Sequence, residues 1–300
     1  MPQVGNANTS VDSIAPVAPF AGFPPRAVFS LLHRALHQAA RMRRFEAASG
    51  GALQLITSKA QLESYIAART KCLTATPGGC AYTAGLLGVE GAHALEGQLS
   101  NLDVLFAAGF RLFGLQHFAD NQAGGSAHGT ERGGLTPWGE QLVAAMEAKG
   151  MVLDVAHSSA AVLQDILRLA TRPFLVSHTG ATALCAPGDG GQGQRTLSDQ
   201  QLRDVAAKGG LIGVGYWREV TCGGTVDAIA DVIMHVVSVA GPQHAALGSD
   251  WDGGVAVPPG LDAAGMAQLT AALVARGLTG DDLRDVMGRN ALRVIASALR

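Results

Sequence analysis

The chain has 300 residues, of which 48% are hydrophobic and 15% are charged, and its formal net charge is −2. These values are typical of a globular chain with room for one large domain or two small ones. A nearly neutral chain without a long basic run is not expected to bind nucleic acid. No apolar stretch of the sequence is long enough to cross a bilayer. The first residues also lack the charged and apolar regions of a signal peptide.

Residues 1–50 are predicted to form an irregular segment followed by an amphipathic helix between Pro24 and Ser49. Apolar residues recur at helical spacing on one face of that helix, at Phe29, Leu32, Ala35, Leu36 and Ala39. A basic amphipathic helix can lie on a membrane, but a helix packed on the outside of a barrel has the same pattern and is commoner. Membrane contact is therefore not expected. Residues 51–300 are predicted to form the main domain, which opens with a strand at Leu53–Thr57 and a helix at Ser58–Ala68.

From Leu86 onward, apolar runs of strand length alternate with segments of helical periodicity. Six strands are predicted, at Leu86–Val89, Phe110–Leu115, Met151–Ala156, Phe174–Val176, Gly210–Tyr216 and Ala245–Gly248. The helices expected with them are Ala94–Ala108, Pro137–Lys149, Ala160–Ala170, Leu197–Lys208 and Val226–Ala240, with a helical tail from Asp262. The alternation indicates an α/β protein with a parallel sheet.

One strand–helix–strand unit, residues 150–180, carries a His at the end of each of its two strands, His157 and His178. Parallel strands joined by a crossover helix end at the same edge of the sheet. Neighbouring strands lie about 4.8 Å apart, so both imidazoles can reach one point above that edge. One such His is often a coincidence, but two at matched positions predict a site.

Polar residues able to bind a metal follow the other strands too, and the complete set is Glu90, His117, His157, His178 and Asp250. This placement favours a (β/α)8 TIM barrel, in which the chemistry lies at the carboxyl ends of the strands. A barrel needs eight strands, so two are either absent or hidden in the first 85 residues. Imidazole and carboxylate are the usual ligands of a catalytic zinc, which keeps a position open for water. Glu90 alone is equally well explained as an acid at the start of a helix.

Other motifs in the sequence give little evidence for a further functional site. Asp250-Trp251-Asp252-Gly253 resembles the start of a calcium loop, but Leu261 occupies the position that requires a bidentate Glu. No nucleophile elbow, phosphate loop or dinucleotide fingerprint is present. The remaining histidines are expected at surface, capping or supporting positions: His33, His37, His93, His128, His235 and His244.

The four cysteines, Cys72, Cys80, Cys185 and Cys222, are too few for a disulfide scaffold and lack the close spacing of a zinc ribbon. Two structural pairs and four buried thiols both fit the sequence, and composition favours the thiols.

The strand-end residues lie in motifs that resemble the membrane (renal) dipeptidase family of zinc metallopeptidases. These motifs are, in order, GVEGAHALEGQLSNLDVLFAAGFRLFGLQH, GGLTPWG, GMVLDVAHSS, PFLVSHTGA, QRTLSDQQL, GSDWDGG and GRNALRVI, and the likeness covers roughly Leu53 to Arg300. The resemblance implies a metal-dependent (β/α)8 barrel that hydrolyses dipeptides, binds two zinc ions and usually forms a homodimer. By this resemblance, Glu90 is similar to the carboxylate that bridges the two zincs, and His157 and His178 to ligands of the second zinc. Asp250 resembles the acid at the first zinc that handles the proton or the attacking water.

The resemblance also implies roles in binding. His117 is similar to the His that contacts the substrate and the tetrahedral intermediate. Arg195 is similar to the Arg that binds the dipeptide carboxylate, a task suited to a planar, bidentate donor. Cys185 and Cys222 fall where some members of the family carry a disulfide, which favours an exported protein.

The sequence departs from the family at its start. The family opens its barrel with a strand that ends in His-x-Asp and holds the first zinc, and no His-x-Asp occurs here. The likeness begins after the family's first two strands, in agreement with the count of six. The second zinc site is therefore expected to form, whereas the first lacks two ligands. Arg195 also differs in its surroundings, because the insert GDGGQGQ precedes it and Thr196 follows where the family usually has Asn.

The sequence thus predicts a zinc-dependent dipeptidase that acts through a metal-activated water. Two alternatives stay open: a non-catalytic, truncated relative that binds metal or peptide, and a barrel hydrolase that acts on esters or lactones. Two absent strands would leave an unpaired sheet edge, which residues 16–25 or a partner chain are expected to cover.

Overall fold

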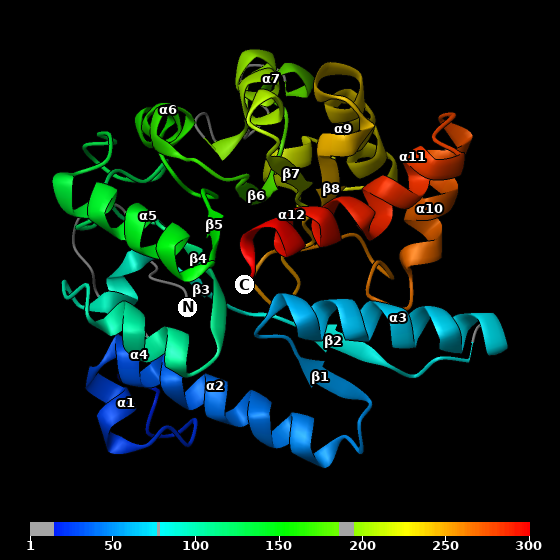
Figure 1. The fold of residues 1–300 in the computed structure, drawn as a ribbon. Helices are drawn as coiled ribbons and strands as arrows, with labels where there is room; N and C mark the ends of the chain where they lie inside the picture. Colours follow the sequence, from blue (N-terminus) through cyan, green and yellow to red (C-terminus); the bar gives the residue numbers. More distant parts are fainter. Residues whose placement is uncertain (1–14, 77–78, 186–194) are drawn as a thin grey trace.

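The main sheet of the computed structural model has six parallel strands in the order β3-β4-β5-β6-β7-β8. The structure describes residues 15–76, 79–185 and 195–300. Two predicted features lie outside the described residues: the first part of the irregular segment and the insert GDGGQGQ. The strands are β3 (Leu87–Glu90), β4 (Phe110–Gly114), β5 (Val152–Asp154), β6 (Leu175–Thr179), β7 (Leu211–Val214) and β8 (Ala245–Leu247). This confirms the predicted α/β class and all six predicted strands. Within the described residues β3 pairs with β4 and β8 with β7, so the sheet forms an arc and not a closed barrel (Figure 1).

Helices that alternate with the strands pack around the outside of this arc (Figure 1). They are α4 (Asn101–Ala107), α5 (Pro137–Lys149), α6 (Ala160–Leu169), α7 (Asp199–Ala207), α8 (Arg218–Thr221) and α9 (Val226–Ala240). Four of them start at a side chain that accepts a hydrogen bond from the backbone N–H three residues on, at Thr136, Ser159, Ser198 and Thr225. Their apolar faces and the strands share one core, in which Phe113, Met146 and Ile233 are fully buried. The predicted helices from Pro137 onward are therefore confirmed.

The predicted helix Ala94–Ala108 is wrong in its first half. A short 3₁₀ turn, η1 (Ala92–Leu95), comes first, and α4 begins only at Asn101. Glu96 and Gly97 separate the two with positive φ angles of 52° and 76°. A left-handed backbone cannot continue a right-handed turn, so the helix ends there.

The single helix predicted between Pro24 and Ser49 is two helices, α1 (Pro25–Phe29) and α2 (Leu31–Ala48). Ser30 separates them because its backbone is extended and its hydroxyl accepts a hydrogen bond from His33 N at 3.1 Å, which starts α2. Leu32, Ala35 and Ala39 lie in the main core as expected, but Phe29 is 88% exposed and does not belong to the apolar stripe.

Helix α2 lies beside β3, which is an edge strand of the sheet among the described residues. Ala35 of α2 and Val89 of β3 both line a cavity of about 130 Å³ between these elements. In residues 16–25, the segment expected to cover this edge, the ring of Phe23 lies 5.1 Å from that of His37 in α2. In the described part of the chain β3 is therefore accompanied by a helix on this side and by one partner strand, β4.

A second, two-stranded parallel sheet consists of β1 (Leu53–Leu55) and β2 (Thr83–Gly85). The strand predicted at Leu53–Thr57 is thus confirmed, whereas β2 was not predicted. Helix α3 (Lys59–Ala75) connects the two strands and extends beyond the predicted Ser58–Ala68.

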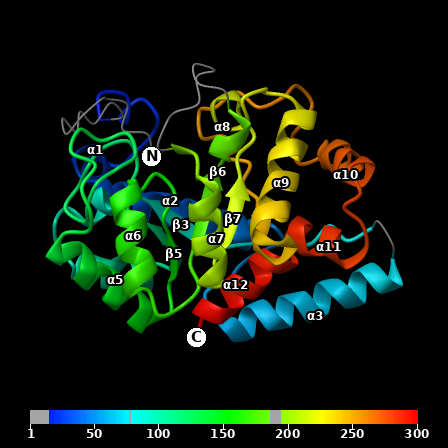
Figure 2. The same cartoon turned by 90° about the horizontal axis from the view of Figure 1, so that it is seen from above.

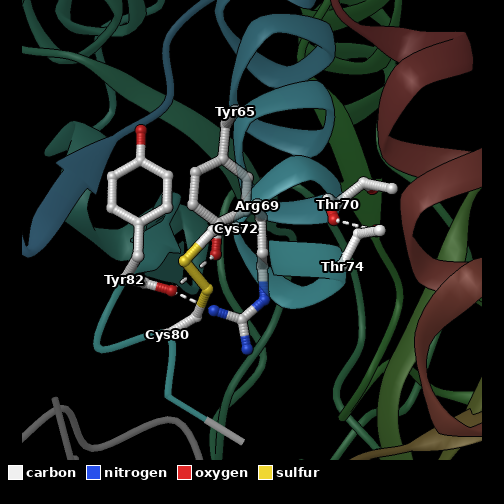
Figure 3. Close-up of a disulfide and its surroundings, with 7 residues drawn as sticks. All are labelled: Tyr65, Arg69, Thr70, Cys72, Thr74, Cys80 and Tyr82. Atoms are coloured by element: carbon white, nitrogen blue, oxygen red, sulfur yellow. Dashed lines mark hydrogen bonds between the residues drawn. A yellow bond between two sulfur atoms is a disulfide. The ribbon is translucent and has the colours of Figure 1, made fainter. Parts of the chain in front are cut away.

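All four cysteines are paired, so the preference for buried thiols is wrong. Cys72 and Cys80 join the last turn of α3 to the segment before β2, with Cα atoms 6.0 Å apart (Figure 3). Tyr65 and Arg69 of α3 also donate hydrogen bonds to the carbonyl of Tyr82. The disulfide therefore lies in a compact bonded group that holds the α3–β2 connection. The second pair, Cys185–Cys222, has Cα atoms 5.3 Å apart.

The C-terminal helix α12 lies at the end of the sheet where the strands begin (Figure 2). The tail consists of α10 (Met266–Ala275), α11 (Gly280–Arg284), the π turn η5 (Asp285–Arg289) and α12 (Asn290–Ala298), so the helical tail is confirmed from Met266 on. Val294 and Ala298 of α12 pack with residues near the start of four strands, Val152, Leu175, Leu211 and Ala246. The opposite end of the sheet, where the strands finish, carries the long loops. Within the described residues no helix has the length and apolar character needed to span a bilayer.

Candidate metal centre

Five of the six predicted site residues lie at the carboxyl ends of the parallel strands. Glu90 is the last residue of β3, and His178 lies within β6. His117, His157 and Asp250 each come three positions after the last residue of their strand, β4, β5 and β8 respectively. The sixth, Arg195, lies in the connection between β6 and α7. The placement inferred from the sequence is therefore confirmed for these residues, although their individual roles stay predictions.

Three of these side chains converge on one point. Glu90 Oε1 lies 3.1 Å from His157 Nε2 and 3.3 Å from His178 Nε2, and the two imidazole nitrogens are 3.0 Å apart. Ligands held at about 2.0–2.1 Å from a tetrahedral zinc lie about 3.3 Å from one another. The three atoms thus form a triangle close in size to one face of a zinc tetrahedron, so the residues fit a single metal ion.

His117 extends this group on the other oxygen of Glu90. Its Nε2 lies 3.7 Å from Glu90 Oε2, and one ligand atom each from Glu90, His117 and His157 all lie within 4.8 Å of one another. The structure therefore places His117 close enough to be a metal ligand. The substrate contact that the family resemblance implies for His117 stays a prediction. Asp250 is further out, with Oδ2 4.0 Å from His178 Nε2.

Hydrogen bonds next to the metal centre orient His178 and join two strand ends. Ser177 Oγ lies 2.7 Å from His178 Nδ1, which directs Nε2 of this ring toward Glu90. Asp154 Oδ1 accepts hydrogen bonds from the backbone N–H groups of Ala156 and Ser177, at 3.0 and 2.9 Å. Asp154 thereby joins the ends of β5 and β6. Loss of such supporting contacts typically weakens metal binding by about ten- to a hundredfold, yet Asp154 and Ser177 were not predicted.

Two residues of the metal centre have a strained backbone. His157 and Asp250 have positive φ angles of 61° and 56°, which residues other than Gly rarely adopt. Each left-handed residue costs on the order of 1 kcal/mol, and the surrounding structure must hold it in place. In His157 this is achieved in part by its carbonyl, which accepts a hydrogen bond from Ala127 N at 2.7 Å.

The electrostatics suit metal binding. Burial alone would raise the pKa of Glu90, but hydrogen bonds from His157 and His178 and the nearby His117 lower it below its ordinary value, so the carboxylate is ionised. Burial lowers the pKa of His157 well below its usual range and that of His117 to about 4. Both rings are therefore neutral near pH 7, as metal ligation requires. Burial raises the pKa of Asp250, although His178 partly opposes this.

Arg195 lies in the connection between β6 and α7, which is hydrogen-bonded to β6. Only 4% of it is exposed, and its guanidinium carbon lies 5.5 Å from the ring centroid of Trp217. The Arg195 carbonyl accepts a hydrogen bond from Thr179 Oγ1 at 2.8 Å, and the Cys185–Cys222 disulfide joins this connection to α8. The sequence predicted Arg195, but Trp217 was missed.

His128 is a further residue of the site that the sequence did not single out. Its ring centroid lies 5.4 Å from that of His157 and 4.7 Å from that of Phe118. His128 follows no strand directly, since it lies in the long loop after β4, so a search restricted to strand ends could not find it. The bridge between Ser126 and Ser158 brings this loop to the site.

Comparison with known proteins gives a consistent family. The sequence profile of membrane dipeptidase, peptidase family M19, matches residues 18–299. The dipeptidase aclJ of Aspergillus oryzae is 34% identical over 218 residues, which make up 70% of this chain and 50% of that protein. An uncharacterised dipeptidase of Schizosaccharomyces pombe is 31% identical over 219 residues, 69% of this chain and 51% of that protein. The chain spans about half the length of these curated relatives.

The fold has solved counterparts. A metallopeptidase from Rhodobacter sphaeroides, liganded with a phosphinate mimic of the dipeptide L-Ala-D-Ala, superimposes with a TM-score of 0.72 at 22% identity. The match covers 87% of this chain and 73% of that protein. At this level of identity the likeness establishes the fold. The profile match over residues 18–299 shows that this chain belongs to the membrane dipeptidase family, peptidase family M19.

Proposed function

We propose that this chain is a zinc-dependent dipeptidase that hydrolyses the peptide bond of dipeptides. The observation that carries the proposal is the triangle of Glu90 Oε1, His157 Nε2 and His178 Nε2, whose sides measure 3.0 to 3.3 Å. Two imidazoles and one carboxylate are a donor set typical of catalytic zinc, although cobalt or manganese accepts the same atoms. The names of the fungal relatives, both dipeptidases, support the same substrate class.

The residues around the triangle have complementary tasks. When bound, the metal polarises the substrate carbonyl and makes water acidic enough to attack it near neutral pH. Asp250 has a raised pKa, so its carboxyl group is suited to take a proton from the attacking water and pass it to the leaving amine. His117 lies across Glu90 from the triangle, where it either donates a hydrogen bond to the carbonyl oxygen or holds a second metal. Arg195 binds the carboxylate of the dipeptide.

We further propose that the protein is exported and forms a homodimer. Two disulfides support export, because such bonds persist in oxidising compartments. The homodimer follows from the family resemblance. Cell fractionation and the mass of the purified protein in solution test these two points separately.

The test of the function is zinc content together with hydrolysis of L-Ala-D-Ala by the zinc-loaded chain. The His157→Ala/His178→Ala variant is expected to lose the zinc and the activity, whereas the matched variant His33→Ala/His235→Ala, altered outside the site, keeps both. Zinc binding without turnover of any dipeptide would favour a non-catalytic relative. Hydrolysis of esters or lactones but not of dipeptides would overturn the substrate class.

A further inference from the structure

The side chain of His128 has an unusual environment for a residue outside the metal triangle. Its Nε2 is buried and has no hydrogen-bond partner in the described structure. A buried polar atom without a hydrogen-bond partner costs free energy. Such an atom in a native structure therefore needs an explanation, and a bound ligand that forms the hydrogen bond is one. The ring faces the metal centre, since His157 and Phe118 are its neighbours.

The loop holds this ring in place independently of any ligand. His128 N donates to Ser126 Oγ at 3.1 Å, and Ser126 Oγ in turn donates to the carbonyl of His117. The backbone N–H of the preceding residue, Ala127, donates a hydrogen bond to the carbonyl of His157 at 2.7 Å. Two residues of the metal centre therefore fix the backbone on which His128 stands. A side chain positioned in this way is preorganised for binding.

A second unpartnered donor lies in the same region. Arg195 is 4% exposed, and its Nη2 is also buried without a hydrogen-bond partner in the described structure. The charge of Arg195 acts on both His128 and His157, since after burial it is the main cause that lowers the pKa of each ring. The guanidinium is therefore close enough to both rings to act on them electrostatically.

Contacts between neighbouring side chains connect His128 to Arg195 through the metal centre. The ring centroids lie 5.4 Å apart for His128 and His157, 4.9 Å for His157 and His178, and 5.8 Å for His178 and Trp217. The guanidinium carbon of Arg195 lies 5.5 Å from the ring centroid of Trp217. The carboxylates of Glu90 and Asp250 also act on Arg195 and favour its charged form. Both carboxylates lie within 4.0 Å of His178 Nε2. His128 Nε2 and Arg195 Nη2 have no such partner in the described structure.

We propose that His128 is a specificity-determining residue, which donates from Nε2 to the free carboxylate of the substrate beside Arg195 Nη2. One carboxylate has two oxygens, so it satisfies both buried donors at once. The family resemblance assigns the carboxylate to Arg195 alone, and the second donor is the new element. The inference rests on the proposed dipeptidase function and narrows its substrate class to dipeptides with an unblocked C-terminus. An amide in this place lacks the charge and presents only one acceptor, so it binds less well.

The experiment compares two ligands that differ only in this group. Binding of a phosphinate mimic of L-Ala-D-Ala and of its C-terminal carboxamide is measured by calorimetry on the zinc-loaded chain, together with hydrolysis of L-Ala-D-Ala and its amide. The variants are His128→Phe, which keeps the ring but removes both nitrogens, and His128→Gln, whose amide nitrogen reaches the place of Nε2. His235→Phe, altered between α7 and α9, is the control for loss of an imidazole elsewhere.

We expect the wild type to prefer the carboxylate over the carboxamide. His128→Phe should reduce this preference by about tenfold or more, as expected for loss of one hydrogen bond to a charged group, while binding of the carboxamide changes little. His128→Gln should stay within about threefold of the wild type, and it also serves as the test if the Phe variant does not fold.

Equal losses for both ligands, or an unchanged preference in both variants, would overturn the role of His128. Binding of neither ligand by the wild type would overturn this inference and the dipeptidase proposal together. Carboxylate-selective binding that depends on His128, without hydrolysis, would overturn only the dipeptidase proposal.

Discussion

His157 Nε2 and His178 Nε2 lie 3.0 Å apart although 21 positions separate the two residues in the chain. The parallel strands β5 and β6 finish at the same edge, and their ends are joined by the backbone hydrogen bonds to Asp154. These two nitrogens and Glu90 Oε1, which lies 3.1 and 3.3 Å from them, can all be satisfied together by one cation. The pair is therefore arranged for a shared ligand.

Ser177 should govern metal affinity through the orientation of His178. Ser177→Ala removes the group that lies 2.7 Å from His178 Nδ1, so the ring gains freedom to turn away from the metal. Loss of such an orienting contact typically weakens metal binding by about ten- to a hundredfold. Zinc titration against a chelator of known affinity measures the effect. Ser238→Ala, on the exposed side of α9, removes a hydroxyl that bonds to a backbone carbonyl and should change nothing. Equal affinities for the Ser177 variant and the wild type would contradict the assigned role.

The metal-free protein should lose stability as the pH falls from about 7 to 4. Burial lowers the pKa of His117 and His128 from 6.5 to about 4, with Arg195 contributing to the shift of His128. Between these values the unfolded chain binds a proton that the folded chain does not, so acid favours unfolding. Each histidine contributes up to about 3 kcal/mol to this loss. Urea unfolding at several pH values measures it, and His128→Phe should flatten the dependence. An unchanged slope in that variant would show that His128 titrates normally.

Removal of the Cys185–Cys222 disulfide should weaken substrate binding, whereas removal of the Cys72–Cys80 disulfide should lower only the stability of the fold. Cys185→Ser/Cys222→Ser frees the connection that carries Arg195, so the KM for dipeptides should rise several-fold with a smaller change in kcat. Cys72→Ser/Cys80→Ser is the matched control, because this pair joins α3 to the segment before β2, away from the strand ends that form the metal centre. It should lower stability by up to about 3 kcal/mol and leave KM unchanged. Similar KM values in both variants would separate the Cys185–Cys222 pair from substrate binding.

Val294 of α12 should be important for the stability of the whole sheet. It is fully buried against residues near the start of β5, β6, β7 and β8, so Val294→Ala leaves a cavity and should cost about 2 kcal/mol. Denaturant unfolding measures this cost. Val104→Ala on α4, where the side chain is 41% exposed, should change stability by less than about 0.5 kcal/mol. If both variants are equally stable, α12 does not support the sheet as described.

The sequence was informative where structure is local. Alternating apolar runs identify the six strands, and the carboxyl end of each parallel strand identifies Glu90, His117, His157, His178 and Asp250. The strand ends meet because the sheet is parallel, which sequence order alone implies. The family resemblance added Arg195.

What the sequence could not reveal depends on contacts between distant segments. The thiols of Cys72 and Cys80 pair because α3 and the segment before β2 lie next to each other. The amino-acid composition does not predict that contact. His128 reaches the site on a loop whose course follows from its bonds to His117 and His157. The break at Ser30 was locally readable, since Ser favours a helix start, but the continuous apolar stripe concealed it.

The place of α12 has a consequence for how the protein is made. The strands that carry the metal ligands leave the ribosome before α12, whose apolar face packs against their starting ends. During synthesis the emerging sheet therefore lacks this contact for Val152, Leu175, Leu211 and Ala246 until α12 follows. The metal centre lies at the other end of the same strands, so α12 stabilises the sheet from the end that carries no metal ligand.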